Sequence, residues 1–278
     1  MTPRELLRLM AAEMTAAGVP DADVDASLLL SHITGQNPMN LRLDSWSQVS
    51  LADEERFRAL CEKRKTRTPL QYLTGVQSFL GRDFHVDERV LIPRPETELL
   101  AELAIAALRK RPSPAALDMC CGSGCLAVSM ALGMPNADIH AADLSEGALA
   151  VTKHNAEHLH AKVTLHQGDL FASIPEGLRF DLIVSNPPYI PAADCLELQE
   201  EVRREPLMAL DGGTDGYDFY RRIAQDAPRF LKEDGVLLLE VGYDQAAGVM
   251  TLCREAGFRE VMAHEDYQHI DRMVEARL

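Results

Sequence analysis

The sequence lacks any long hydrophobic run. Its longest apolar stretches are short, such as Val236–Leu239, whereas a membrane-spanning helix needs about 20 apolar residues. The first residues also lack the apolar core of a signal peptide. Six cysteines without an export signal are expected to stay reduced. We therefore expect a cytoplasmic protein with no membrane partner.

Basic residues are also scarce, because 28 Lys and Arg stand against 43 Asp and Glu, a net charge of -15. Non-specific nucleic-acid binding depends on Lys and Arg contacting phosphates, so we expect no stable nucleic-acid partner. The one basic cluster consists of Lys63, Arg64, Lys65 and Arg67. We expect it to be a solvated helix end; the alternative hypothesis is a contact with acidic protein or ribosomal RNA.

Apolar residues make up 46% of the 278 residues, which is enough for one large domain or two ordinary ones. The first 75 residues are predicted to be helical. Thr2 and Glu5 form a capping box for a first helix, a second is predicted over residues 23–32, and a third opens at Ser50 and continues to about Lys65. This region carries 9 basic and 10 acidic residues, so nearly all the negative charge lies beyond it. The difference indicates two domains.

The pattern changes at about residue 76. Residues 76–93 contain two short strands around a Gly-containing turn, which predicts a β-hairpin linker between a helical domain (residues 1–75) and a second domain (residues 94–278). The second domain alternates strands with helices, which predicts an α/β fold with a doubly wound, largely parallel sheet. Its predicted strands are residues 115–119, 137–143, 163–167, 180–185 and 236–241, followed by an antiparallel pair, 258–263 and 269–276; its predicted helices are residues 97–111, 126–132, 145–158, 218–231 and 245–256.

A glycine-containing loop follows the strand that ends at Met119. Gly122 and Gly124 allow a sharp turn and a close approach of a ligand, and Asp143 ends the next strand, where a carboxylate can accept both hydroxyls of a ribose. This pattern indicates an adenosine-type ligand and also fits a dinucleotide fingerprint. Asp118 would attract a cationic sulfonium and repel a pyrophosphate, so it favours S-adenosylmethionine over NAD.

A second motif, Asn186-Pro187-Pro188-Tyr189, ends the strand over residues 180–185. The two prolines make the backbone rigid and remove N–H donors. The Asn186 side-chain oxygen and the Pro187 carbonyl can then accept hydrogen bonds from one planar NH2 group, and Tyr189 offers a flat face to stack on it. Such a group is a poor nucleophile because its lone pair is delocalised, so orientation and electrostatics would carry the catalysis.

With both motifs, the chain resembles the class I S-adenosylmethionine-dependent methyltransferases. Four further segments are similar to the protein glutamine N5-methyltransferases that modify peptide chain release factors, the HemK/PrmC family. They are Thr68–Gly75 (TPLQYLTG), Leu91–Glu98 (LIPRPETE), Glu205–Leu210 (EPLMAL) with the following Gly212-Gly213, and His269–Arg272 (HIDR).

The resemblance implies a Rossmann-like seven-stranded sheet with a small N-terminal helical domain. It implies S-adenosyl-L-methionine as cofactor, the glutamine of the Gly-Gly-Gln loop of class I release factors as substrate, and a monomer. It also implies site residues: Cys120, Cys121, Gly122, Ser123 and Gly124 around the methionine part of the cofactor, Asp143 on the ribose, Asp169 and Leu170 beside the adenine, and Asn186, Pro187, Pro188 and Tyr189 on the glutamine amide, with Asn186 also beside the cofactor.

Two positions depart from the family pattern. Cys120 stands where glycine is frequent, so we expect its side chain to point away from the ligand. Leu170 stands where some relatives have an aromatic residue, so a weaker apolar contact is expected there. Nearby, Arg94 either lines the cofactor site or pairs with Glu96 and Glu98, and we expect the ion pairing.

Several alternatives remain open at this point. An adenine-N6 methyltransferase of DNA or RNA would use the same chemistry but needs a basic groove, and an NAD-linked oxidoreductase leaves the Asn-Pro-Pro-Tyr motif unexplained. A non-catalytic cofactor-binding module is disfavoured by the complete motif. Cys120, Cys121 and Cys125 lack CxxC spacing and a fourth ligand, so no metal site is expected.

Overall fold

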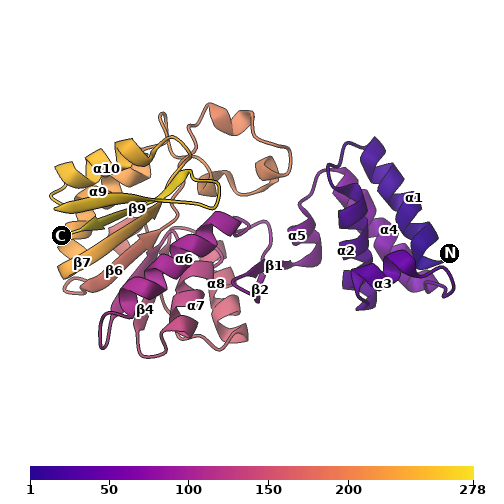
Figure 1. Cartoon of the computed structure of the whole chain (residues 1–278), viewed down its shortest axis with the longest axis horizontal. Coiled ribbons are helices and arrows are strands. Elements are labelled where there is room, and N and C mark those ends of the chain that lie inside the picture. Colours follow the sequence, from indigo (N-terminus) through magenta and orange to yellow (C-terminus); the bar gives the residue numbers. More distant parts are fainter. The chain divides into compact units, whose positions relative to one another are not determined.

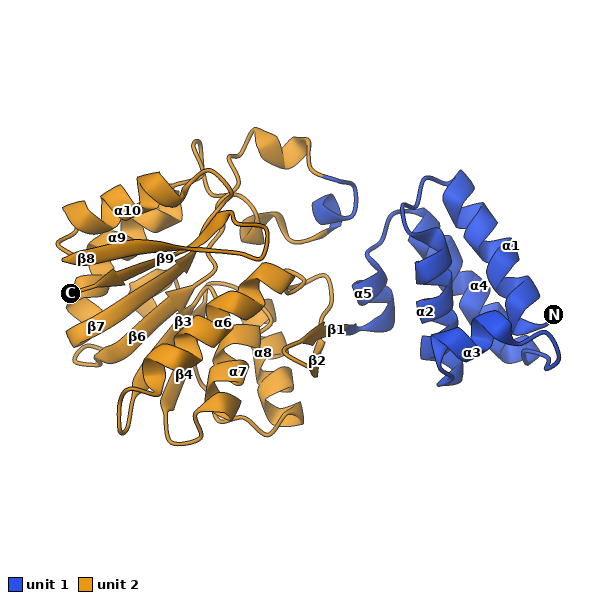
Figure 2. Cartoon of the chain, viewed as in Figure 1, with its two compact units in different colours: residues 1–76, 199–204 blue, residues 77–198, 205–278 orange.

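The computed structural model describes residues 1–278, which form two compact units (Figure 2). Unit 1 comprises Met1–Val76 together with Gln199–Arg204, and unit 2 comprises Gln77–Leu198 and Glu205–Leu278. None of the helices is long and apolar enough to cross a membrane.

Unit 1 is helical. Its first helix begins with the predicted capping box, since the Thr2 hydroxyl accepts from the Glu5 N–H at 3.3 Å and the Glu5 carboxylate accepts from the Thr2 N–H at 3.0 Å. The helices pack around a common apolar core that includes Leu6, Leu29 and Phe57. Two short helices, α3 and α5, were not predicted. The helices are α1 (Pro3–Ala16), α2 (Ala22–Thr34), α3 (Pro38–Leu43), α4 (Leu51–Lys65) and α5 (Leu70–Thr74), and the added segment holds the 3-10 helix η3 (Val202–Arg204).

A buried ion cluster joins the added segment to these helices. The Arg64 guanidinium, on a residue only 5% exposed, donates to Asp25 at 2.7 Å and to Glu201 at 2.9 Å. Arg67 donates to Glu201 at 2.7 Å as well. Burial opposes ionisation of Glu201, yet the hydrogen bonds from both arginines lower its pKa to about 2. The prediction of a solvated helix end is therefore wrong for Arg64 and Arg67, because carboxylates distant in sequence cover them.

Unit 2 is built on a seven-stranded sheet (Figure 1). The strand order of this sheet is β5-β4-β3-β6-β7-β9-β8. Strands β3 to β7 are parallel, and β9 runs antiparallel to both of its neighbours. The predicted fold class is confirmed. The strands are β3 (Ala115–Met119), β4 (Asp138–Asp143), β5 (Thr164–Gln167), β6 (Phe180–Ser185), β7 (Leu231–Glu240), β8 (Glu260–Glu265) and β9 (Asp271–Arg277).

Helices cover both faces of this sheet. Because neighbouring residues of a strand point to opposite faces, Leu182 and Val184 of β6 lie in one apolar cluster and Ile183 lies in the other. The first cluster contains residues of α6 (Pro95–Leu108), α7 (Cys125–Gly133) and α8 (Glu146–His158), and the second contains residues of α9 (Asp218–Phe230) and α10 (Ala246–Glu255).

A separate two-stranded hairpin, β1 (Val76–Phe79) and β2 (Arg82–His85), precedes α6 as predicted. The rings of Phe79 and Phe84 meet edge to face at 5.8 Å, which anchors the hairpin in the first apolar cluster.

The sheet topology also places the loops that carry polar residues. β3 pairs with β4 on one side and with β6 on the other. The chain therefore leaves β3 at the point where the strand order reverses, and in such sheets ligands bind beyond the carboxyl ends of the strands at this point. Asp143 ends β4, Asn186 follows β6, and Glu240 ends β7 at this edge.

Candidate active site

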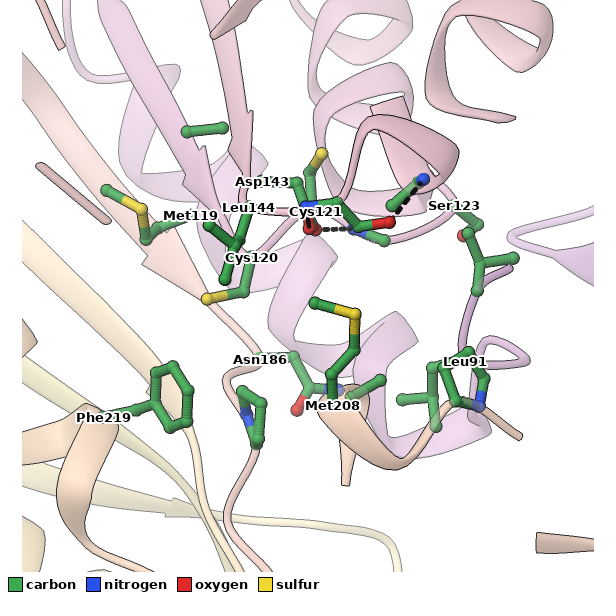
Figure 3. A pocket seen from close by; sticks show the side chains of 18 of the residues that line it. Leu91, Met119, Cys120, Cys121, Ser123, Asp143, Leu144, Asn186, Met208 and Phe219 are labelled. Atoms are coloured by element: carbon green, nitrogen blue, oxygen red, sulfur yellow. Dashed lines mark hydrogen bonds between the residues drawn. The ribbon is translucent and has the colours of Figure 1, made fainter. Parts of the chain in front are cut away.

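A cavity of about 400 Å³ opens at this edge of the sheet. Many of the residues predicted for the site line it together, from loops that follow four different strands (Figure 3). The predicted residues in its lining are Cys120, Cys121, Gly122, Ser123, Asp143, Asp169, Leu170, Asn186 and Pro188. Gly124, Pro187 and Tyr189 lie outside the lining.

Asp143 is held by the glycine loop. One carboxylate oxygen accepts from the Gly122 N–H at 2.9 Å, and the other accepts from the Ser145 N–H at 2.9 Å. Burial raises the pKa of this carboxyl, and the N–H donors counter that effect. Each oxygen keeps a further lone pair, so the carboxylate can accept two more hydrogen bonds from a ligand.

Gly124 has a structural reason to be glycine. It precedes α7 with a φ of +77°, and a Cβ at this position would lie 2.6 Å from the Thr152 methyl carbon. Thr152 in turn donates its hydroxyl proton to the Gly122 carbonyl at 2.9 Å. The packing at Gly124 is therefore linked to the loop that holds Asp143.

Cys120 lines the cavity, so the expectation that its side chain points away is wrong. Its backbone has a φ of +62°, a conformation that glycine adopts more easily than other residues. This geometry directs the thiol into the space beside Asn186 and Phe219 that Figure 3 shows. Burial raises the pKa of the thiol, which keeps it protonated and unreactive.

Asp118 is buried and does not line the cavity. Its carboxyl accepts from the Ala127 N–H at 3.0 Å, in the first turn of α7. Burial raises its pKa to about 8, despite this hydrogen bond. The structure therefore gives Asp118 a role in holding the start of α7 and does not support a negative charge beside a sulfonium.

Asn186 lies across the cavity from Asp143 (Figure 3). Its amide nitrogen donates to the Thr97 hydroxyl at 3.2 Å, and that hydroxyl donates to the Glu240 carboxylate at 2.7 Å. Farther along the motif, the Tyr189 carbonyl accepts from the Gln245 side chain at 2.9 Å. The supporting residues Thr97, Glu240 and Gln245 were not predicted.

Arg94 also lines the cavity, but it does not pair with Glu96 or Glu98 as expected. Its guanidinium donates to Glu205 at 2.5 Å, and Glu205 also accepts from the Ile92 N–H at 2.9 Å. Glu98 instead accepts from the Leu80 N–H at 2.7 Å, which ties the hairpin to α6. Both halves of the Leu91–Glu98 segment are thus held by partners outside it.

The rest of the lining is largely apolar and includes residues that were not predicted for the site. Asp169, at the edge of the cavity, forms an exposed ion pair with Arg222 at 2.7 Å. The apolar lining residues that were not predicted for the site include Leu91, Leu144, Leu207, Met208 and Phe219. Leu207 and Met208 belong to the Glu205–Leu210 segment that resembles the family, and this membership is the sequence signal by which they could have been found.

Comparison with known proteins first shows which class of protein this chain resembles, the methyltransferases. Residues 97–203 match the methyltransferase small domain family, and residues 5–75 match the PrmC N-terminal domain family. A methyltransferase from Pyrococcus furiosus shares the fold, with a TM-score of 0.51 and 16% identity over 72% of this chain and 90% of that one.

Two curated relatives then give the particular family. The release factor glutamine methyltransferase of Geobacter sulfurreducens is 42% identical over 100% of this chain and 97% of its own length. That of Chlorobaculum tepidum is 42% identical over 96% of this chain and 94% of its own. The chain belongs to the release factor glutamine methyltransferase family, so the predicted resemblance is confirmed and favoured over the nucleic-acid and NAD-linked alternatives.

Proposed function

We propose that this protein transfers a methyl group from S-adenosylmethionine to the side-chain amide nitrogen N5 of a glutamine, the one in the Gly-Gly-Gln motif of class I release factors. Family membership supports this function. The observation that carries it is the position of Asn186, whose amide lines the same cavity as Asp143 and is held by its nitrogen, which leaves its oxygen as an acceptor.

The residues around the cavity fit the proposed cofactor. Its volume of about 400 Å³ lies in the range of small-molecule sites, and Asp143 has lone pairs for two ribose hydroxyls. We assign Cys120 to Gly124 to the methionine part and Asp169 with Leu170 to the adenine. When bound, S-adenosylmethionine supplies a methyl group on a positively charged sulfur.

The proposed catalytic role of the Asn-Pro-Pro-Tyr motif is to orient the side-chain amide of the substrate glutamine. The Asn186 oxygen and the Pro187 carbonyl accept from the two hydrogens of the glutamine NH2, which raises the electron density on nitrogen and directs its lone pair. Pro188 keeps the backbone rigid, and Tyr189 offers a flat face to the amide. No strong general base is needed, because the methylated nitrogen loses its proton after transfer. Orientation and fixed dipoles thus supply the rate.

We assign substrate recognition to residues 1–75, connection to the hairpin segment 76–93, and methyl transfer to residues 94–278. The acidic second region suits a protein substrate with basic surface. We further propose a monomer that acts in the cytoplasm, without a stable nucleic-acid or membrane partner.

The test supplies labelled S-adenosylmethionine with either a class I release factor or DNA, and mass spectrometry locates the methyl group. We expect label on the glutamine of the release factor. Label on DNA adenine alone would contradict the proposal.

An Asn186→Ala variant tests the site. It should leave cofactor affinity largely intact and lose at least ~100-fold in rate, as enzymes do when a group that stabilises the transition state is removed. Asn136→Ala, in an exposed loop, is the matched control and should retain the full rate. A near-normal rate for Asn186→Ala would show that the amide is held elsewhere.

A further inference from the structure

We propose that Thr97 and Glu240 are positioning residues that set the orientation of the Asn186 amide, so that its oxygen and not its nitrogen faces the substrate. The inference rests on the proposed function of Asn186 as an acceptor. An asparagine amide is nearly symmetric in shape. Neighbouring groups must therefore fix whether the amide oxygen or the amide nitrogen of Asn186 faces the cavity, because an NH2 group there would repel the NH2 of the glutamine.

The hydrogen bonds among Glu240, Thr97 and Asn186 fix this orientation. The Thr97 hydroxyl has one proton, which it gives to the Glu240 carboxylate at 2.7 Å, a distance typical of a charge-assisted bond. Its oxygen can then only accept. The group that faces it must be a donor, and the Asn186 nitrogen lies 3.2 Å away. With the amide reversed, two acceptor oxygens would face each other.

Burial of Thr97 and Glu240 protects these hydrogen bonds from competition by water. Thr97 is 2% exposed and Glu240 is 3% exposed, so water cannot easily replace either partner. The two residues come from rigid elements, Thr97 from the first turn of α6 and Glu240 from the end of β7. The register of β7 on β6 pairs Leu239 with Ser185, which brings Glu240 level with Asn186. The backbone of Glu240 is fixed further by the Tyr220 hydroxyl, which donates to its carbonyl at 2.9 Å.

The same geometry predicts a dependence on pH. Burial raises the pKa of Glu240 to about 7. A protonated Glu240 can donate to the Thr97 oxygen, which frees the Thr97 proton to point at Asn186 and favours the reversed amide. The protein in which Glu240 is protonated should therefore be inactive. The other titratable or charged groups that act on Glu240, or that its charge affects, are Glu96 of α6, Cys125 of α7, Tyr220 of α9, Arg272 of β9 and Tyr189 of the motif.

Kinetics of three variants test the proposal. Thr97→Val keeps the shape but not the hydroxyl, and we expect kcat to fall about 10–100-fold, the usual effect of losing a partner that orients a site residue. The dissociation constant for S-adenosylmethionine should change less than about threefold. Thr97→Ser restores the hydroxyl and should restore kcat. Thr251→Val, at an exposed helical threonine whose hydroxyl bonds only its own helix, is the matched control.

Glu240→Gln and the wild-type protein are compared across pH. The wild-type kcat should fall as the pH drops through about 7, and Glu240→Gln should lack this limb because it removes the titrating group. A wild-type kcat for Thr97→Val, or a loss of cofactor affinity equal to the loss of rate, would overturn the proposal. So would a Thr97→Ser variant as slow as Thr97→Val.

A measurement without substrate separates this inference from the proposed function. In protein labelled with nitrogen-15 at asparagine, the side-chain NH2 signal of Asn186 is assigned by its loss in Asn186→Ala. We expect this signal to shift with pH around 7 and to stop doing so in Glu240→Gln. A signal that does not titrate in the wild type refutes the positioning role even if glutamine is methylated. A titrating signal without methylation refutes only the proposed function.

Discussion

Replacing Gly124 by alanine tests how the cofactor loop is built. The added Cβ faces two separate costs. The backbone φ of +77° is unfavourable for any residue with a side chain, and the Cβ would lie 2.6 Å from the Thr152 methyl carbon and 3.0 Å from its hydroxyl oxygen. The first cost is conformational, and the second is steric.

The two costs have different sizes. A left-handed conformation costs an alanine about 1–2 kcal/mol, and forcing extra volume into a packed region costs about 1–3 kcal/mol more. We therefore expect Gly124→Ala to lower the free energy of unfolding by about 2–5 kcal/mol. Gly81→Ala is the matched control in the same unit, because Gly81 has a φ of +69° with nothing within 4 Å of its Cβ position. It should lose only the conformational part.

Urea unfolding followed by circular dichroism measures both variants. The double variant Gly124→Ala/Thr152→Ser removes the closest carbon and should recover about 1 kcal/mol or more. If Gly124→Ala is no more costly than Gly81→Ala, or if the second substitution recovers nothing, the steric reasoning is wrong.

Three further predictions concern charged groups. Asp143→Asn should weaken S-adenosylmethionine binding by about 10–100-fold in titration calorimetry, because hydrogen bonds to a charged group contribute about 1.5–3 kcal/mol; an unchanged affinity would remove Asp143 from the site. Burial raises the pKa of Glu240 from 4.5 to about 7, so the folded state favours its protonated form and the contribution of this residue to the free energy of unfolding should fall by about 3 kcal/mol as the pH rises from 4.5 to 7. Glu240→Gln should flatten that slope in urea titrations at several pH values, and an unchanged slope would assign it to other groups. Arg64→Met should cost about 3–5 kcal/mol because it leaves the Asp25 carboxylate buried without its partner, and a loss below about 1 kcal/mol in thermal unfolding would show that solvent replaces the arginine.

Local patterns predicted most of the fold. The bounds of β3 and β6 agree with the prediction to the residue, because each is a run of buried side chains between turn-forming residues. The starts of α1 and α4 were also predicted, because the capping residues of each helix lie within four positions of each other in the sequence. Helix α3 was missed because its six residues are too few to show a helical period.

The site was predictable only where its parts are contiguous. Asn186 and Asp143 belong to short motifs, and the structure brings both to one cavity. The support of Asn186 by Thr97 and Glu240 joins positions 143 residues apart, for which a single sequence gives no signal. The error at Cys120 has a related origin, because the direction of its side chain depends on a positive φ that composition does not reveal.

The membership of residues 199–204 in unit 1 has a consequence for protein engineering. The chain passes between the units at three points, so neither unit is one continuous piece of sequence. A fragment that ends at Val76 would keep Arg64 and Arg67 but lose Glu201, the carboxylate that both of them bind. An exchange of helical units between relatives must therefore transfer residues 199–204 as well, because otherwise the grafted arginines would lack their shared carboxylate.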